Sequence, residues 1–276
     1  MNIGIVGLGL IGGSLARATK ETTDHTVWAY DLDRSALLGA SLVGAIDGEL
    51  DDDALQRTDL LLLSLYPQAA VDYVKAHLTS IRPGTIVIDC CGVKRAVCEP
   101  LCKLAKEHGL VFLGGHPMAG TQFWGFSHAR ASLFRGASMI LTTEGVNDVR
   151  LLERVKTYFL SIGFETLTFT TPEEHDRIIA YTSQLAHIVS NAYVKSPTAM
   201  QRKGFSAGSY KDMTRVAKLN VGMWTELFLE NSDNLCRELD LLIANLQQYR
   251  DALGAGNEEM LRNLLEDGRQ TKRQAG

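Results

Sequence analysis

The chain has 276 residues, a formal net charge of −4 and a sequence pI near 6.0. This length allows one large domain or two moderate ones, and the mild acidity excludes a global attraction to nucleic acid or to an anionic membrane. The most apolar run, residues 60–65, is far shorter than the roughly eighteen residues that a membrane helix needs. Because Met1 leads directly into an apolar strand, we expect no signal or transit peptide and a cytoplasmic protein.

The five cysteines favour free thiols over a disulfide framework, since their number is odd and no signal peptide is expected. Cys98 and Cys102 lie one helical turn apart, and Cys90 and Cys91 end a strand. A metal site built from these four is the weaker alternative, because no paired C-x-x-C spacing accompanies them. We therefore expect small buried thiols and no metal.

The first apolar strand breaks into a helix at a glycine-rich loop. This loop carries Gly7, Gly9 and Gly12 in the G-x-G-x-x-G spacing. The first glycine allows a tight turn, the second lets the backbone approach a pyrophosphate, and the third lets the helix pack closely on the strand. The N–H groups at the helix start, including those of Leu10 and Ile11, then face the phosphates at the positive end of the helix dipole. The loop predicts a dinucleotide site.

A second strand, at residues 26–30, ends in Asp31. An acid about twenty residues past the glycines binds the adenosine ribose 2′-hydroxyl and repels a 2′-phosphate, which favours NAD over NADP. Arg34 lies close by in sequence and is able to soften that preference. Leu65 and Tyr66, at the end of the next apolar strand, complete the predicted cofactor site. A methyltransferase or a flavin protein with a similar first turn is the alternative.

Strands and helices alternate through the first part of the chain. The strand at residues 59–65 is mostly apolar, which is typical of a parallel strand covered on both faces. Further helices are expected from about residue 34 and over 67–77, 94–106 and 146–161, with strands over 85–90, 110–113, 137–142 and 164–169. This alternation predicts an α/β fold: a doubly wound, Rossmann-like domain over residues 1–169, with its ligands at the carboxyl ends of the strands.

The pattern becomes helical in the remainder, so we expect an all-helical domain for substrate binding and dimerisation over residues 170–276. Thr171 is the expected N-cap of its first helix, with Pro172 in the first turn and Glu174 closing a capping box. This helix is expected to continue to about Lys195, because Ser196-Pro197 ends it.

A later segment has an apolar stripe at alternating four- and three-residue steps, which Gly254 closes. Its members are Leu235, Leu239, Leu242, Leu246, Tyr249 and Leu253. Long apolar helices in so short a region often bury such a stripe on a second subunit, so we expect a homodimer. The polar stretch 267–276 is expected to be frayed.

His116 is the strongest catalytic candidate. It follows a predicted strand and Gly114-Gly115, and it precedes the rigid Pro117. On such a strand-end loop its imidazole is placed to accept a proton from a substrate hydroxyl while hydride leaves the same carbon. A histidine held by a loop hydrogen bond is the alternative.

Two further groups of polar residues lie in the helical part. Ser183 and His187 are one turn apart on a mostly apolar line, where a buried and satisfied histidine is a fair alternative to a functional one. His175-Asp176 is interpreted as helix-start polarity.

A basic segment follows later in the chain. If it is helical, Lys211, Arg215 and Lys218 share one face, which suggests an anion on an otherwise acidic protein. Arg215 is able to clamp a carboxylate with two parallel hydrogen bonds. A solvated charged face is the alternative.

Four segments together resemble the prephenate/arogenate dehydrogenase family, in order and spacing, from residue 1 to about 250. They are residues 7–14, 116–121, 183–187 and 211–217, the last followed by Met223-Trp224. The resemblance is specific because the histidine-proline motif and the Lys-Asp-Met-Thr-Arg motif occur in the same chain.

The resemblance implies an NAD-dependent oxidative decarboxylation of a small substrate on the route to tyrosine. In this reaction His116 takes the proton of the ring 4-hydroxyl as C4 passes hydride to NAD, and loss of the ring carboxylate restores aromaticity. It further implies that Arg215 holds a substrate carboxylate, that His187 helps to shape the substrate pocket and that Trp224 lines its wall. Thr121, Ser183 and Lys211 are the other residues expected at the substrate.

One residue departs from the family pattern. Relatives usually carry a serine just before the Val-Lys pair that follows the strand at 85–90, whereas this chain has Gly92 there. Cys91, Thr121 or a water is expected to supply the missing hydrogen bond, whose loss otherwise costs about 1 kcal/mol or more.

Three other functions compete with prephenate oxidation. Arogenate specificity changes only the contacts to the substrate side chain. A β-hydroxyacid or pyrroline-carboxylate oxidoreductase has a similar two-domain build, but those families lack the His-Pro-Met-Ala-Gly motif. An NAD-sensing protein without turnover is the alternative that is not an enzyme.

Overall fold

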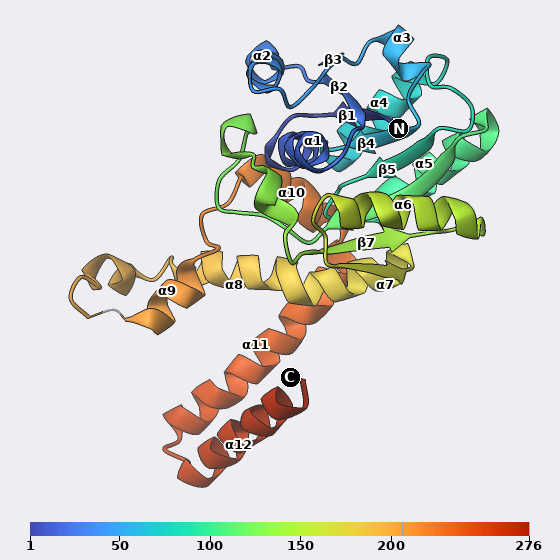
Figure 1. Ribbon diagram of the computed structural model, residues 1–276. Helices are drawn as coiled ribbons and strands as arrows, with labels where there is room; N and C mark the ends of the chain where they lie inside the picture. Colours follow the sequence, from blue (N-terminus) through green and yellow to red (C-terminus); the bar gives the residue numbers. More distant parts are fainter. Residues whose placement is uncertain (206, 276) are drawn as a thin grey trace.

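A computed structural model describes residues 1–205 and 207–275 (Figure 1). Its centre is an eight-stranded sheet in the order β3-β2-β1-β4-β5-β6-β7-β8, parallel except where β7 runs antiparallel to β6. The strands are β1 (Asn2–Val6), β2 (Thr26–Tyr30), β3 (Gly48–Glu49), β4 (Leu60–Leu63), β5 (Ile86–Asp89), β6 (Val111–Pro117), β7 (Ser138–Thr142) and β8 (Thr166–Thr170). The sheet with its connecting helices confirms the predicted Rossmann-like architecture.

Helices accompany the sheet and then form the rest of the chain. Those of the first part are α1 (Leu10–Thr22), α2 (Arg34–Leu42), α3 (Asp52–Leu55), α4 (Pro67–His77), α5 (Arg95–His108) and α6 (Val149–Ser161), with 3₁₀ turns η1 (Phe126–His128) and η2 (Ala131–Phe134). The second part contains α7 (Pro172–Ile179), the π-helical η3 (Ala180–Leu185), α8 (Ala186–Tyr193), the 3₁₀ turn η4 (Pro197–Gln201), α9 (Gly208–Thr214), α10 (Val221–Glu230), α11 (Ser232–Gly254) and α12 (Glu258–Ala275).

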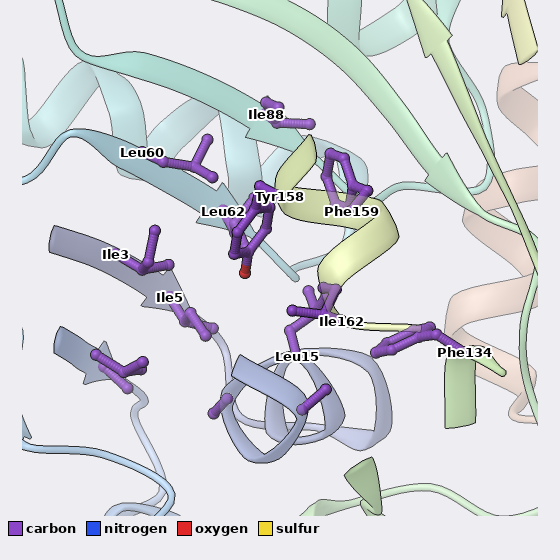
Figure 2. Packing of buried hydrophobic residues seen from close by; sticks show 14 of the residues in the cluster. Ile3, Ile5, Leu15, Leu60, Leu62, Ile88, Phe134, Tyr158, Phe159 and Ile162 are labelled. Atoms are coloured by element: carbon purple, nitrogen blue, oxygen red, sulfur yellow. The ribbon is translucent and has the colours of Figure 1, made fainter. Parts of the chain in front are cut away.

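The central strands of the sheet are buried on both faces, and β4 is apolar at every position. Successive side chains point to opposite faces, so Leu60 and Leu62 join one apolar cluster and Leu61 and Leu63 join another. Figure 2 shows the first cluster, in which Tyr158 and its neighbours on α6 pack over the strands beside α1. The carboxyl ends of β1, β4, β5 and β6 are thereby held at one edge.

The first helix of the second part begins as the sequence predicts, but it is not a continuous α-helix. Thr171 Oγ1 accepts a hydrogen bond from Glu174 N at 3.2 Å, whereas the Glu174 carboxylate pairs with Arg177, so the capping box is only half formed. The predicted single helix to Lys195 is wrong in its middle, because residues 180–185 form a π-helix. Such bulges often occur at functional sites.

The carboxyl-terminal end is ordered as helix α12, so the expected fraying of residues 267–276 is wrong for the described part. Gly276 lies outside the described residues. Helix α12 folds back along α11, where Tyr249 Oη donates to the Leu264 carbonyl at 3.1 Å, and this hairpin projects away from the sheet (Figure 1). Among the described residues, no helix is both long and apolar enough to cross a membrane.

Candidate active site

The glycine loop has the backbone geometry that a pyrophosphate site requires. Gly7 has φ +88°, and a Cβ there would lie 2.5 Å from the Ser64 carbonyl oxygen. A Cβ on Gly12 would lie 1.8 Å from the Gly7 carbonyl oxygen, so the third glycine is needed for the close turn. By contrast, a Cβ on Gly9 would meet no atom within 4 Å, so the backbone there faces open space.

Helix α1 starts next to that open space. Among the residues that the structure describes, none caps its first turn through a side chain. The first N–H groups of an α-helix have no partner within the helix, so those at Leu10 and Ile11 are available to an anion. The loop and the helix start therefore fit the phosphates of a dinucleotide.

Asp31 follows β2 and forms a hydrogen bond with the backbone of the glycine loop. Its carboxylate accepts the Leu8 N–H at 2.6 Å and the Asp33 N–H at 2.8 Å. Arg34 makes two hydrogen bonds to the Glu49 carboxylate, at 2.7 and 3.1 Å. This pairing occupies the guanidinium that a 2′-phosphate would need, in keeping with the predicted preference for NAD.

The other two predicted cofactor residues follow β4. Leu65 is half-buried, and its carbonyl accepts a hydrogen bond from Cys91 Sγ at 3.4 Å. Tyr66 is 46% exposed and precedes Pro67, the first residue of α4. Both lie at the carboxyl edge of the sheet beside the glycine loop. Their contact with a cofactor stays a prediction.

His116 lies in a strand rather than on the loop after one. The strand β6 continues through Pro117 because β7 pairs with it antiparallel, and His116 stands opposite Ile140. Two glycines precede it for a steric reason: a Cβ at Gly115 would lie 2.3 Å from the Asp89 carbonyl oxygen. His116 thus remains at the carboxyl edge, three strand spacings from β1, or about 14 Å.

The interpretation of His175 and Asp176 as helix-start polarity is wrong. Both are buried on α7. His175 Nε2 lies 2.8 Å from His116 Nδ1, and His175 Nδ1 lies 2.7 Å from Asp176 Oδ1. The only signal in the sequence was an acid next to a histidine in a capped helix, which does not reveal the partner 59 residues earlier.

A buried ion pair lies behind His116. Lys94 Nζ donates to Asp89 Oδ2, and both side chains are almost completely inaccessible to water. Asp89 also accepts the Gly115 N–H at 3.0 Å, which ties the pair to the strand that carries His116. Burial, then the neighbouring His175 and then the Lys94 charge hold the pKa of His116 well below 6.5. The His116 imidazole is therefore neutral at physiological pH, as a general base must be.

Three of the predicted substrate residues, Ser183, His187 and Trp224, lie on η3, α8 and α10. His187 stacks on Trp224 with ring centroids 3.8 Å apart, and its Nδ1 donates to the Ser183 carbonyl at 2.9 Å. Burial and then the positive charge of Arg215 lower the pKa of His187. The structure thus brings His187, Trp224, Ser183 and Arg215 together.

The expected basic stripe is not formed. Helix α9 ends at Thr214, so Lys211, Arg215 and Lys218 do not share one helical face. All three side chains are exposed. Thr121 is also exposed, on the loop after β6, and its hydroxyl interacts locally with Phe123. Contacts of Lys211 and Thr121 with substrate stay predictions.

Gly92 packs against α10. A Cβ there would lie 3.2 Å from Leu227 Cδ1, so a serine at this position requires Leu227 to shift slightly. Cys91 Sγ donates to Leu65, and Thr121 interacts with Phe123, so neither supplies a hydrogen bond to His116 in this structure. Leu227 is one turn from Trp224, so α10 connects Gly92 to the group of His187, Trp224, Ser183 and Arg215, here called the His187 cluster.

A dinucleotide loop and a neutral histidine at the same sheet edge define a nucleotide-dependent dehydrogenase. The family models for the prephenate dehydrogenase nucleotide-binding domain and dimerization domain match residues 15–167 and 171–267. The chain belongs to the prephenate dehydrogenase family.

Individual relatives support this family assignment. The cyclohexadienyl dehydrogenase of Zymomonas mobilis is 31% identical, with 94% of this chain and 91% of that protein covered. A structure of prephenate dehydrogenase from A. aeolicus, in complex with hydroxyphenyl propionate and NAD+, has a TM-score of 0.87 and 26% identity over 100% of this chain and 98% of that one. Synechocystis arogenate dehydrogenase has a TM-score of 0.83 and 26% identity, with both chains fully covered. These three relatives are named after different substrates.

Proposed function

We propose that this protein is an NAD-dependent prephenate dehydrogenase, which converts prephenate to 4-hydroxyphenylpyruvate and carbon dioxide in tyrosine biosynthesis. The observation that carries the proposal is a neutral, partly buried His116 at the sheet edge that also bears the glycine loop. The fit of NAD rests on the open backbone at Gly9, on Asp31 and on the pairing of Arg34 with Glu49.

In this proposal His116 accepts the proton of the 4-hydroxyl of prephenate. NAD, when bound, supplies the acceptor for the hydride that leaves C4. The electron pair of the bond to the departing carboxylate then completes the aromatic ring, so the carboxylate leaves as carbon dioxide. The proton held by His116 is returned to the phenolic oxygen or to solvent, which leaves the base neutral for the next turnover.

Arogenate is the second candidate substrate, since a structural relative is named an arogenate dehydrogenase. The two substrates share the reacting ring and differ in the side chain, which has a keto group in prephenate and an ammonium group in arogenate. The exposed Arg215, whose charge acts on His187, favours a side chain without an ammonium.

The test is NADH formation by the purified protein with each substrate. We expect kcat/KM to be higher with prephenate than with arogenate, and higher with NAD than with NADP. A higher value with arogenate would reverse the substrate assignment. Tight NAD binding without turnover of either substrate would support the sensor alternative instead.

Arg215→Ala is expected to raise KM for prephenate with little change in kcat. The guanidinium is proposed to bind a carboxylate in both the ground state and the transition state, and a hydrogen bond to a charged group contributes about 1.5–3 kcal/mol, or roughly 10- to 150-fold. Steady-state kinetics measure this effect. Lys218→Ala is the matched control, because Lys218 is an exposed cation in the same segment. An unchanged KM in Arg215→Ala would remove this residue from the substrate site.

A homodimer formed through the helical part is also proposed. The α11–α12 hairpin projects from the sheet (Figure 1), and part of its predicted stripe stays uncovered within one chain, with Leu246 57% and Leu253 65% exposed. Leu235 at the other end of the stripe is buried within the chain. A second subunit would remove the exposed part from water.

A further inference from the structure

The strongest feature that the proposed function leaves unused is the chain of polar groups behind His116. It begins at Asp176, passes through His175 and ends at His116, with both links shorter than 2.9 Å. Asp176 is fully buried and His175 is 2% exposed, so water does not compete for these hydrogen bonds. A buried network of this kind has a definite arrangement of protons, and that arrangement can be deduced.

The deduction starts at Asp176. Its Oδ1 accepts the Lys94 N–H at 2.7 Å, and its Oδ2 accepts the Arg95 N–H at 3.0 Å and the Arg95 Nε–H at 3.3 Å. Burial alone would raise the pKa of Asp176, but hydrogen bonds from His175 and the Arg95 backbone hold it below its ordinary value. Asp176 is therefore ionised and only accepts hydrogen bonds.

The proton positions on the two imidazoles follow. Since Asp176 only accepts, His175 Nδ1 carries a hydrogen and donates it. Burial lowers the pKa of His175 despite the neighbouring carboxylate, so the ring is neutral and its Nε2 is an acceptor. His116 Nδ1 must then carry the hydrogen of the 2.8 Å bond between the rings. The remaining nitrogen of His116, Nε2, has a lone pair.

We propose that His175 and Asp176 are positioning residues, which hold His116 in the tautomer whose Nε2 accepts the substrate proton. This inference rests on the proposed function of His116 as the base. Asp176 on α7 accepts hydrogen bonds from backbone N–H groups at the start of α5, which fix its position. A residue of the helical part of the chain thereby determines which nitrogen of His116, a residue of the sheet, carries the hydrogen. Lys94 and Asp89 are the charged groups facing the network from the sheet side.

Asp176→Asn tests the proposal. An amide has the size of the carboxylate. Its oxygen is expected at the Oδ2 position, where it keeps both Arg95 donors, so its nitrogen lies at the Oδ1 position, loses the bond from the Lys94 N–H and is able to donate to His175 Nδ1. This donation reverses both hydrogen bonds and places a hydrogen on His116 Nε2. We expect kcat to fall by about 10²- to 10⁴-fold, the range for loss of general base catalysis or of its correct tautomer. KM and the affinity for NAD should change little, and the loss should persist across the pH range instead of shifting the profile.

Asp233→Asn is the matched control. Asp233 is the other carboxylate on Arg95, with bonds of 2.5 and 2.9 Å, but it does not contact either histidine. If Asp176 acted only by holding the helices to the sheet through Arg95, both variants would lose stability and activity alike. The proposal requires near-normal kcat in Asp233→Asn.

A second measurement needs no turnover. In the full-length protein labelled with ¹⁵N-histidine, His116 Nε2 should show the shift of an unprotonated imidazole nitrogen, and in Asp176→Asn the shift of a protonated one. If Asp176→Asn does not fold, His175→Phe takes its place, because a phenyl ring fills the space but offers no acceptor to the His116 Nδ1–H. The hydrogen on His116 is then no longer confined to Nδ1, and the Nε2 shift should move toward that of a protonated nitrogen. A protonated His116 Nε2 in the wild-type protein would overturn the proposal. Failure to oxidise prephenate or arogenate would instead refute the proposed function, and the nitrogen shifts would still report the tautomer.

Discussion

His116→Asn is expected to lower kcat by about two or more orders of magnitude, the usual contribution of a general base. The asparagine amide is able to donate to His175 Nε2 as the imidazole Nδ1–H does, so the buried network keeps its partner. It has no basic nitrogen to take a proton from the substrate. Steady-state kinetics with prephenate measure the loss, and an equilibrium titration with NAD measures cofactor affinity, which should stay near the wild-type value.

His108→Asn is a suitable control for this variant. His108 is an exposed residue at the end of α5, where Nδ1 contacts the Leu104 carbonyl at 3.0 Å, far along the helix from the His116 network. Its kcat should match that of the wild-type protein. Equal losses of NAD affinity and kcat in His116→Asn would show that the residue supports the fold instead of the reaction.

Lys94→Met is expected to lower the free energy of unfolding by about 3–5 kcal/mol, because it leaves the Asp89 carboxylate buried without its counter-charge. Burial alone would lower the pKa of Lys94, yet the Asp89 charge raises it overall, so Lys94 is protonated in the wild-type protein. Urea denaturation of the two proteins measures the difference. The predicted effect is large because neither group has access to water.

The double variant Asp89→Asn/Lys94→Met distinguishes the cost of the unpaired Asp89 charge from the cost of the altered packing at position 94. Asparagine keeps an oxygen for the Gly115 N–H, which Asp89 accepts at 3.0 Å, but it carries no charge that needs a partner. We expect the double variant to be more stable than Lys94→Met alone, with a coupling energy of about 0.5–3 kcal/mol. A loss below about 1 kcal/mol in Lys94→Met would contradict the assignment of a charged, buried pair.

Local patterns in the sequence were sufficient for most of the fold. The apolar run that became β4, the glycine spacing before α1 and the cap at Thr171 each specify structure through neighbouring residues. The family motifs also pointed to His116, His187, Arg215 and Trp224, and the structure brings the last three together. Such features are readable because periodicity, turns and caps depend on a few adjacent positions.

The alternating architecture, the dinucleotide loop and His116 as the candidate base were therefore all readable from the order of residues alone. The inclusion of His116 in β6 became clear only from the folded chain, since β7 must pair with that segment. The same holds for the burial of His175 and Asp176 beside it, because their partners at His116 and the start of α5 are 59 to 82 residues away along the chain. Hydrogen bonds between residues so far apart produce no periodic pattern in the sequence, so they can be recognised only in the folded structure.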